Sequence, residues 1–182
     1  MGYCTTISGG NIMKTEIKYD EEIEKFHLPR WNELPNVDLY LDQVVTLLEN
    51  YLSNYIKEEN EKEGKFITKT MINNYVKHGV VKPPINKKYN KEHMAYFFVV
   101  FILKQVYSME DIKKLIELAI KTSPVNQTYD LFCNELEKAI RLTFIGENYI
   151  DHNKLTQEQY LLRNVVQSFA NRLYVKKVFL KN

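Results

Sequence analysis

Apolar side chains recur at the three- and four-residue spacing of an α-helix in several long stretches of this chain, a pattern typical of helices with one buried face. It predicts amphipathic helices over Val37 to Ile56, Met109 to Thr122, Val125 to Phe144 and Thr156 to about Leu180. Residues that favour helix ends stand at these boundaries, namely Asn36 or Asp38, Ser108 with Asp111, Ser123-Pro124, Gly146, and Thr156 with Gln159. A mainly helical protein is therefore expected.

One further helix has no polar face. Asn90 can cap it, and every position from Phe97 to Leu103 is apolar. Such a helix is stable only when protein surrounds it on all sides. The apolar run from Met94 to Leu103 is also about half the ~20 residues that span a bilayer. We therefore expect it to lie in the core of a protein that has no membrane span.

A short polar helix and a hairpin precede this buried helix. The polar helix runs from Thr68 to Lys77, and Gly79 marks its end. Its residues Ile72 and Val76, with Tyr75 in part, are spaced to pack inward, which leaves Lys69, Thr70, Asn73, Asn74 and Lys77 facing outward. Pro83-Pro84 then prevents a helix, and a lysine-rich hairpin is expected over Lys82 to Tyr89.

This order of elements resembles the DNA-binding head of the MerR family, a winged helix-turn-helix. The family pattern Y-x-x-x-G-L-L-x-P is matched by Tyr75, Gly79, Val80, Val81 and Pro83, the wing ending R-x-Y by Lys87 and Tyr89, the polar helix start by Asn90, and S-L-E-E-I by Ser108 to Ile112. Two features depart from the pattern. Asn73 stands where the family has an arginine, and the linker Lys57 to Lys65 replaces a tight turn.

A second resemblance extends over about residues 26 to 145. Leu28-Pro29-Arg30-Trp31, Leu34-Pro35 and Asp38 to Gln43 are similar to a family of uncharacterised bacterial proteins, a domain of unknown function with a MerR-like head and a helical tail. Trp31 is expected either to anchor this N-terminal arm to the core or to accompany an arm that lies on DNA with Arg30 forward. This resemblance implies the fold and supplies no activity.

The expected architecture has three parts. Residues 1–25 form a flexible N-terminal segment, residues 26–122 a MerR-like winged-helix domain with a small two-stranded β wing, and residues 123–182 a C-terminal two-helix region. In the last helix, a stripe of residues at a/d spacing fits either a dimer seam or packing against the head: Leu162, Val166, Phe169, Leu173, Lys176 and Leu180. The MerR resemblance implies a homodimer formed through a C-terminal helix.

The distribution of charge changes the picture more than the total does. The formal net charge is only +2, yet the segment from Lys65 to Lys91 holds seven lysines and no acidic residue, and acidic segments flank it. Such segregation predicts a positive patch on a near-neutral molecule.

Each part of this patch suits a different contact with DNA. Asn73 and Asn74 can pair with adenine, Lys69 and Lys77 with guanine or phosphate, and Thr70 with phosphate or a thymine methyl group. Lys87, Lys88 and Lys91 are suited to backbone phosphates. Tyr89 is expected to pack on the buried helix, with a hydroxyl that can reach a phosphate. The alternatives are that the asparagines are merely solvated and that the hairpin lysines only discourage strand pairing.

The sequence shows no pattern of a catalytic or metal site. Cys4 and Cys133 fit no metal or redox spacing, and the four histidines stand singly, with His93 expected on the surface of a first helical turn. No phosphate-binding loop or nucleophile motif occurs. No enzyme activity, cofactor or metal is expected, no effector pocket is marked, and without an apparent leader or membrane span the expected location is the cytoplasm.

The sequence thus predicts sequence-specific binding of double-stranded DNA in transcriptional control, by a homodimer on a two-fold-related site. Two other functions stay open. One is a protein-interaction adaptor that keeps the winged-helix scaffold and uses its tail for a partner. The other is a phage-type excision or recombination accessory factor that shares the head.

Overall fold

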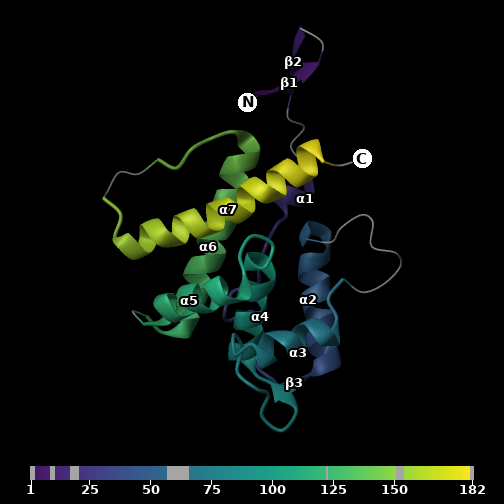
Figure 1. Cartoon of the computed structure of the whole chain (residues 1–182), viewed down its shortest axis with the longest axis vertical. Coiled ribbons are helices and arrows are strands. Elements are labelled where there is room, and N and C mark those ends of the chain that lie inside the picture. The colour runs from purple at the N-terminus through teal and green to yellow at the C-terminus, as the bar shows by residue number, and fades with distance from the viewer. Residues whose placement is uncertain are drawn as a thin grey trace. The chain divides into compact units, whose positions relative to one another are not determined.

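A computed structural model describes residues 3–8, 11–16, 21–56, 66–121, 123–150 and 154–180 of the chain. The chain divides into two compact units, described separately below. One spans His27–Asn134, and the other combines Met1–Phe26 with Glu135–Asn182. Figure 1 labels the elements of both.

The unit His27–Asn134 is mainly helical and holds one small two-stranded antiparallel sheet, as the sequence predicts, although the partner of the hairpin strand comes from Leu39–Tyr40 and not from the hairpin itself. Its elements are β3 (Leu39–Tyr40), α2 (Leu41–Ile56), α3 (Lys69–Lys77), β4 (Lys88–Tyr89), α4 (Lys91–Leu103), α5 (Met109–Ile120) and the first part of α6 (Val125–Ile145). Strands β3 and β4 pair with one another. The predicted linker Lys57 to Lys65 and Thr122 lie outside the described residues.

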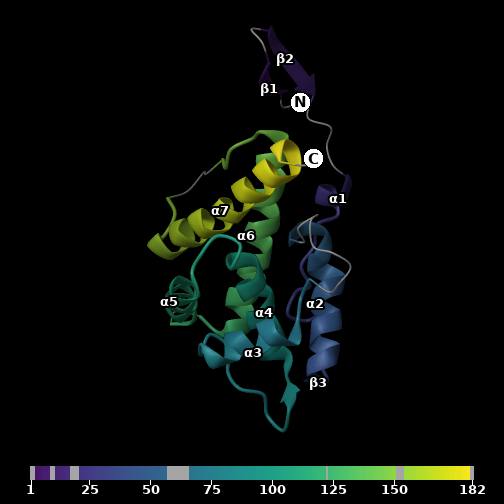
Figure 2. The same cartoon turned by 45° about the vertical axis from the view of Figure 1, so that its right-hand side comes forward.

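Helix α4 forms the core of this unit, as the apolar run predicts. Its residues from His93 to Leu103 are buried, except Val99. Asn90 caps it by accepting a hydrogen bond from the backbone N–H of His93 at 3.1 Å. A helix buried on all sides can support several neighbours at once, and Figures 1 and 2 show α2 and α3 beside it.

His93 corrects one sequence prediction. It was expected on the surface, but only 5% of it is exposed. Its Nδ1 accepts a hydrogen bond from the backbone N–H of Asn90 at 3.1 Å, which completes a capping box, and its Nε2 lies 3.2 Å from the carbonyl oxygen of Pro83. The imidazole therefore joins the start of α4 to the segment that leads into the hairpin.

The start of α2 also differs from the prediction. The helix was expected from Val37, but it begins at Leu41, and Leu39 and Tyr40 are extended and pair with Tyr89 and Lys88. The backbone N–H of Tyr40 donates to Oε1 of Gln43 at 2.9 Å and so satisfies one free donor at the helix start. At Leu39 and Tyr40, pairing with a strand distant in sequence therefore replaces the helix that the local pattern predicts.

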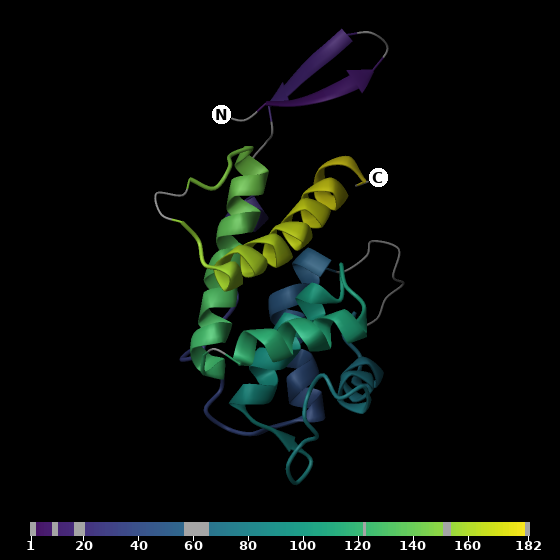
Figure 3. The same cartoon turned by 60° about the vertical axis from the view of Figure 1, so that its left-hand side comes forward.

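In the other unit, β1 (Tyr3–Ser8) and β2 (Asn11–Glu16) form an antiparallel hairpin, and α1 spans Glu21–Glu24. The sequence predicted no regular structure in this segment. Helix α7 (Gln157–Phe179) begins with the predicted capping box of Thr156 and Gln159, and it crosses α6 in Figure 3. The middle of its apolar stripe, Val166, Phe169 and Leu173, is buried within the chain, so these three side chains are not free to form a dimer seam.

No helix within the described ranges has the length and apolar character needed to cross a membrane.

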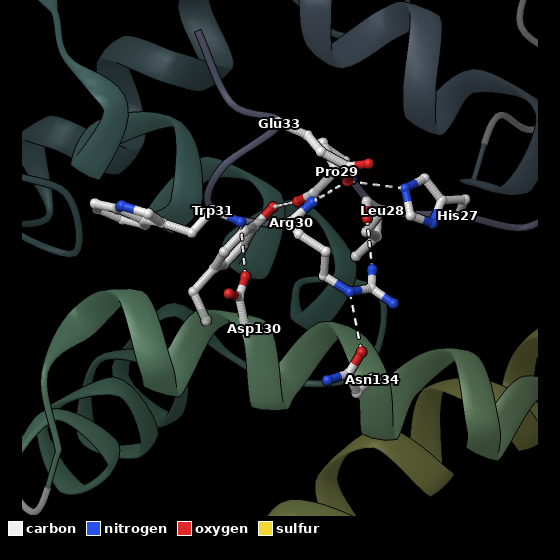
Figure 4. A network of polar contacts seen from close by, with 9 residues as sticks. His27, Leu28, Pro29, Arg30, Trp31, Glu33, Asp130 and Asn134 are labelled. Atoms are coloured by element: carbon white, nitrogen blue, oxygen red, sulfur yellow. Dashed lines mark hydrogen bonds and ion pairs between the residues drawn. The ribbon is translucent and has the colours of Figure 1, made fainter. Parts of the chain in front are cut away.

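Polar bonds hold the N-terminal arm of the unit His27–Asn134 against the first part of α6 (Figure 4). The Nε of Arg30 donates to Oδ1 of Asn134 at 3.0 Å, and the backbone N–H of Trp31 donates to Oδ1 of Asp130 at 2.6 Å. The buried hydroxyl of Tyr129 donates to the carbonyl oxygen of Pro29 at 2.8 Å. The arm is therefore held in place by these hydrogen bonds and by the buried side chains of Leu28 and Leu34. The ring of Trp31, which the sequence offered as the anchor, is only half-buried.

Removing the Tyr129 hydroxyl tests this anchor. Tyr129→Phe should lower the free energy of unfolding by about 1–3 kcal/mol, because the carbonyl of Pro29 would lose its buried donor. Urea unfolding followed by the fluorescence of Trp31 measures the change, since Trp31 is the only tryptophan and lies in the arm. Tyr160→Phe is the control, because Tyr160 is 62% exposed. Equal stability of the two variants would refute the anchoring role.

Candidate nucleic-acid interface

Helix α3 displays the polar residues that the sequence assigns to DNA. The Thr68 hydroxyl caps it by accepting from the backbone N–H of Met71 at 3.2 Å. Ile72 and Tyr75 are buried, whereas Val76 is only half-buried, so Tyr75 and Val76 exchange the roles expected of them. The predicted outward residues are all exposed: Lys69, Thr70, Asn73, Asn74 and Lys77.

Tyr75 fixes α3 to the core. Its ring lies 5.0 Å from the ring of Phe101 in an edge-on arrangement, and burial raises the pKa of its hydroxyl to about 12. Gly79 ends the helix with a φ of +67°, a left-handed conformation that glycine adopts without strain. The exposed face of α3 is thus held in one orientation by a buried aromatic contact on its opposite side.

The hairpin turns through two residues in the left-handed region. Asn86 has a φ of 51° and Lys87 a φ of 63°, and Ile85 and Lys88 exchange backbone hydrogen bonds of 2.9 Å on either side. This is the geometry of a type I′ turn, in which asparagine is favoured at the first position and glycine at the second. A lysine therefore occupies a position where glycine would be less strained.

Strand β4 gives the hairpin its inner contacts. Tyr89 is 3% exposed, and its ring packs 5.5 Å from Phe97 and 5.5 Å from His93. Its expected packing on the buried helix is therefore confirmed. Burial also raises the pKa of the Tyr89 hydroxyl. Tyr89 positions the hairpin rather than adding to its exposed surface.

The lysines of the predicted patch differ in their surroundings. Lys77 and Lys87 are exposed, and neither makes an ion pair within the described part of the chain. Lys88 and Lys91 are half-buried beside aromatic rings, with Nζ of Lys88 5.0 Å from the ring centre of Tyr40 and Nζ of Lys91 5.9 Å from that of Trp31. Both rings attract the ammonium groups and limit their motion.

Two carboxylates from outside the lysine-rich segment reduce its charge. Asp42 at the start of α2 lies 2.6 Å from Nζ of Lys69, and Glu92 lies 3.2 Å from Nζ of Lys82. The segment contains no acid in sequence, but folding brings acids to it. The positive surface is therefore weaker around Lys69 and Lys82 than the sequence suggests.

Helix α5 supplies a cation that the sequence did not single out. Nζ of Lys113 lies 3.7 Å from the place that a Cβ on Gly79 would occupy, which puts it beside the C-terminal end of α3. The C-terminal end of a helix carries partial negative charge from the helix dipole and attracts a cation. No local signal marks Lys113, because its role depends on the packing of α5 near α3.

The described residues contain no group of three or more histidine, cysteine, aspartate or glutamate side chains placed to hold a metal ion.

Comparison with known proteins identifies one family. A family model described as a domain of unknown function, DUF1836, matches residues 29–132. The match begins at Pro29 and ends at Phe132, so it includes α3, the hairpin and the arm contacts made by Asp130 and Tyr129. Asn134, which binds Arg30, lies just outside it. No curated protein and no solved structure matches the chain significantly.

Substitutions at Lys87 test the left-handed backbone conformation of the turn, because Lys87→Gly and Lys87→Val remove the same charge. Lys87→Gly should raise the free energy of unfolding by about 0.5–1 kcal/mol, because glycine adopts the left-handed conformation without a steric penalty. Lys87→Val should lower it, since a β-branched residue fits this region poorly. Urea unfolding followed by Trp31 fluorescence provides the comparison. A glycine variant less stable than the valine variant would rule out the turn described here.

Proposed function

We propose that this chain, which belongs to the DUF1836 family, binds double-stranded DNA in a sequence-specific manner and acts as a cytoplasmic transcriptional regulator. In this proposal the unit His27–Asn134 acts as a winged helix-turn-helix of the MerR type. Helix α3 enters the major groove, and the hairpin contacts the sugar–phosphate backbone.

The observation that carries the proposal is the shared support of α3 and the hairpin on α4. Tyr75 of α3 contacts Phe101, and Tyr89 of the hairpin contacts Phe97. These two phenylalanines are four residues apart, so they lie on one side of α4 about 6 Å from one another along its axis. The two elements are therefore attached at neighbouring points, and the hairpin lies below α3 in Figures 1 and 2.

The size and chemistry of α3 suit the major groove. Its nine residues make a rod about 13 Å long, and the groove, about 12 Å wide, accepts an α-helix. Asn73 and Asn74 can read adenine edges, whereas Lys69, Thr70 and Lys77 supply contacts to guanine, to a thymine methyl group or to phosphate. All five side chains are exposed on the helix.

The hairpin suits the backbone of the duplex. Lysine is a compact charge on a flexible stem and fits phosphate better than a base edge. Lys87 at the turn and Lys88 and Lys91 near the rings would hold phosphates. Tyr89 would keep the hairpin in place from its buried side.

We extend the proposal to a homodimer on a two-fold-related site. Large apolar side chains are exposed at the C-terminal end of α7: Val175 at 46%, Phe179 at 46% and Leu180 at 67%. They leave apolar surface for a second copy outside the buried middle of the stripe.

A second function, a protein-interaction adaptor, has one observation in its favour. Ile112 is the buried residue of α5, and Leu118 and Ile120 on the same helix are 49% and 39% exposed. Exposed apolar surface of this kind suits a protein partner. Fluorescence anisotropy with random genomic duplexes at low and moderate salt separates the two functions, because an adaptor should show only weak, sequence-independent attraction.

The first prediction for DNA binding concerns salt dependence. Lys87→Ala and Lys88→Ala should each weaken binding and flatten the slope of log affinity against log salt by about 0.9, because each lysine neutralises one phosphate. Anisotropy titrations of a duplex that the wild type binds measure the slope. Lys154→Ala serves as the control, since Lys154 is exposed in the other unit. Unchanged affinity and slope in both hairpin variants would refute the role of the hairpin.

The second prediction is a gain of affinity. Asp42→Asn should tighten binding by up to about fivefold at low salt, because it frees Lys69 from an exposed ion pair of modest strength. The salt slope should steepen at the same time. Asp38→Asn is the matched control, because Asp38 is exposed nearby and makes no ion pair within the described residues. An Asp42→Asn variant that binds like the control would remove Lys69 from the interface.

A further inference from the structure

The small sheet of the hairpin has an outer face that the sequence did not predict. Tyr40 of β3 pairs directly with Lys88 of β4, and Lys88 pairs across the turn with Ile85. Directly paired residues in an antiparallel sheet point to the same side. Tyr40, Lys88 and Ile85 therefore form one row across three extended segments, called the outer row below.

The two sides of this sheet differ sharply in burial. Leu39 and Tyr89, the neighbouring pair, are 9% and 3% exposed and face the core. In the outer row, Tyr40 is 54% and Ile85 is 64% exposed, with the half-buried Lys88 between them. An aromatic ring, a cation and a branched aliphatic chain thus lie side by side on a surface with no covering element described.

We propose that the outer row is a contact surface for the deoxyribose–phosphate backbone of duplex DNA, an inference that rests on the proposed function. Lys88 binds a phosphate, and the Tyr40 ring and Ile85 pack on the apolar faces of the flanking sugars. The charge of the row and of Lys87 at the turn is complementary to that of the backbone.

Dimensions favour the backbone over either groove. Neighbouring strands lie about 4.8 Å apart, so three extended segments span about 10 Å. This width exceeds the minor groove, which is about 6 Å wide. The major groove is occupied by α3 in the proposed complex. The ridge of sugars and phosphates between the grooves is the part of the duplex that the row can cover.

Tyr40 also places the lysine. Its ring lies 5.0 Å from Nζ of Lys88, and such a contact holds the ammonium group over the ring face. Because the ring already restricts the Lys88 side chain, less conformational entropy is lost when the ammonium group binds a phosphate. One side chain both contacts a sugar and positions the neighbouring charge.

The test uses variants of the full chain that remove apolar surface without changing charge. Ile85→Thr and Tyr40→Thr place threonine, which favours extended backbone, at both positions. Each should weaken duplex binding by about three- to tenfold, with an unchanged salt slope. Lys88→Ala should weaken binding and flatten the slope by about 0.9. This contrast separates apolar contact from charge. Anisotropy measures binding, and circular dichroism with Trp31 fluorescence verifies the fold.

Two controls sharpen the comparison. Val37→Thr removes an apolar side chain that is 66% exposed and lies outside the row, and it should bind like the wild type. Tyr40→Phe keeps the ring and should stay within about twofold of the wild type.

Three other results would contradict the inference. If Ile85→Thr and Tyr40→Thr bind like the wild type while Lys88→Ala binds more weakly, only the charge of Lys88 contacts DNA. The inference that the row packs on the sugars then fails, and the proposed function stands. If Val37→Thr weakens binding as much as Ile85→Thr, the effect is not specific to the row and the inference fails. If the wild type binds no duplex even at low salt, the proposed function fails and the inference fails with it.

Discussion

The structure of the unit His27–Asn134 depends on the complete burial of α4. Within little more than one turn, this helix offers rings to three different elements: Phe97 to the hairpin, Phe98 to Tyr51 of α2, and Phe101 to α3. Each contact is edge-on, the arrangement that aromatic quadrupoles favour. This one buried helix thereby fixes the positions of α2, α3 and the hairpin. Because α3 and the hairpin pack on α4 through their apolar sides, their polar sides face outward.

The surface produced by this packing balances charge locally. Asp42 and Glu92 form ion pairs with Lys69 and Lys82. Lys88 and Lys91 lie beside aromatic rings instead. Exposed ion pairs contribute little to stability, so their main physical effect is to lower the positive electrostatic potential at the protein surface. The surface around Lys69 and Lys82 is therefore less positive than the seven lysines of the segment suggest.

Local chemistry predicted the helices well. Asn90, Ser108 and Thr156 cap helices where their side chains and spacing indicate, and the apolar run after Asn90 is buried as expected. Long-range contacts account for what the sequence could not predict. Tyr40 lies within the helix predicted from Val37 but pairs with a strand more than forty residues later. In the same way, the burial of His93, the acids beside the lysines and the position of Lys113 depend on partners that no short motif specifies.

The most direct test is an amide chemical-shift titration of the full chain with a short duplex at low salt. If DNA binds as proposed, the shifts that move most belong to the exposed residues of α3 and to the turn from Ile85 to Lys88. The buried amides of α4 should change little, because that helix is the support and not the contact. Changes confined to α5 or α7, or no change at all, would contradict a DNA-binding role for α3 and the hairpin.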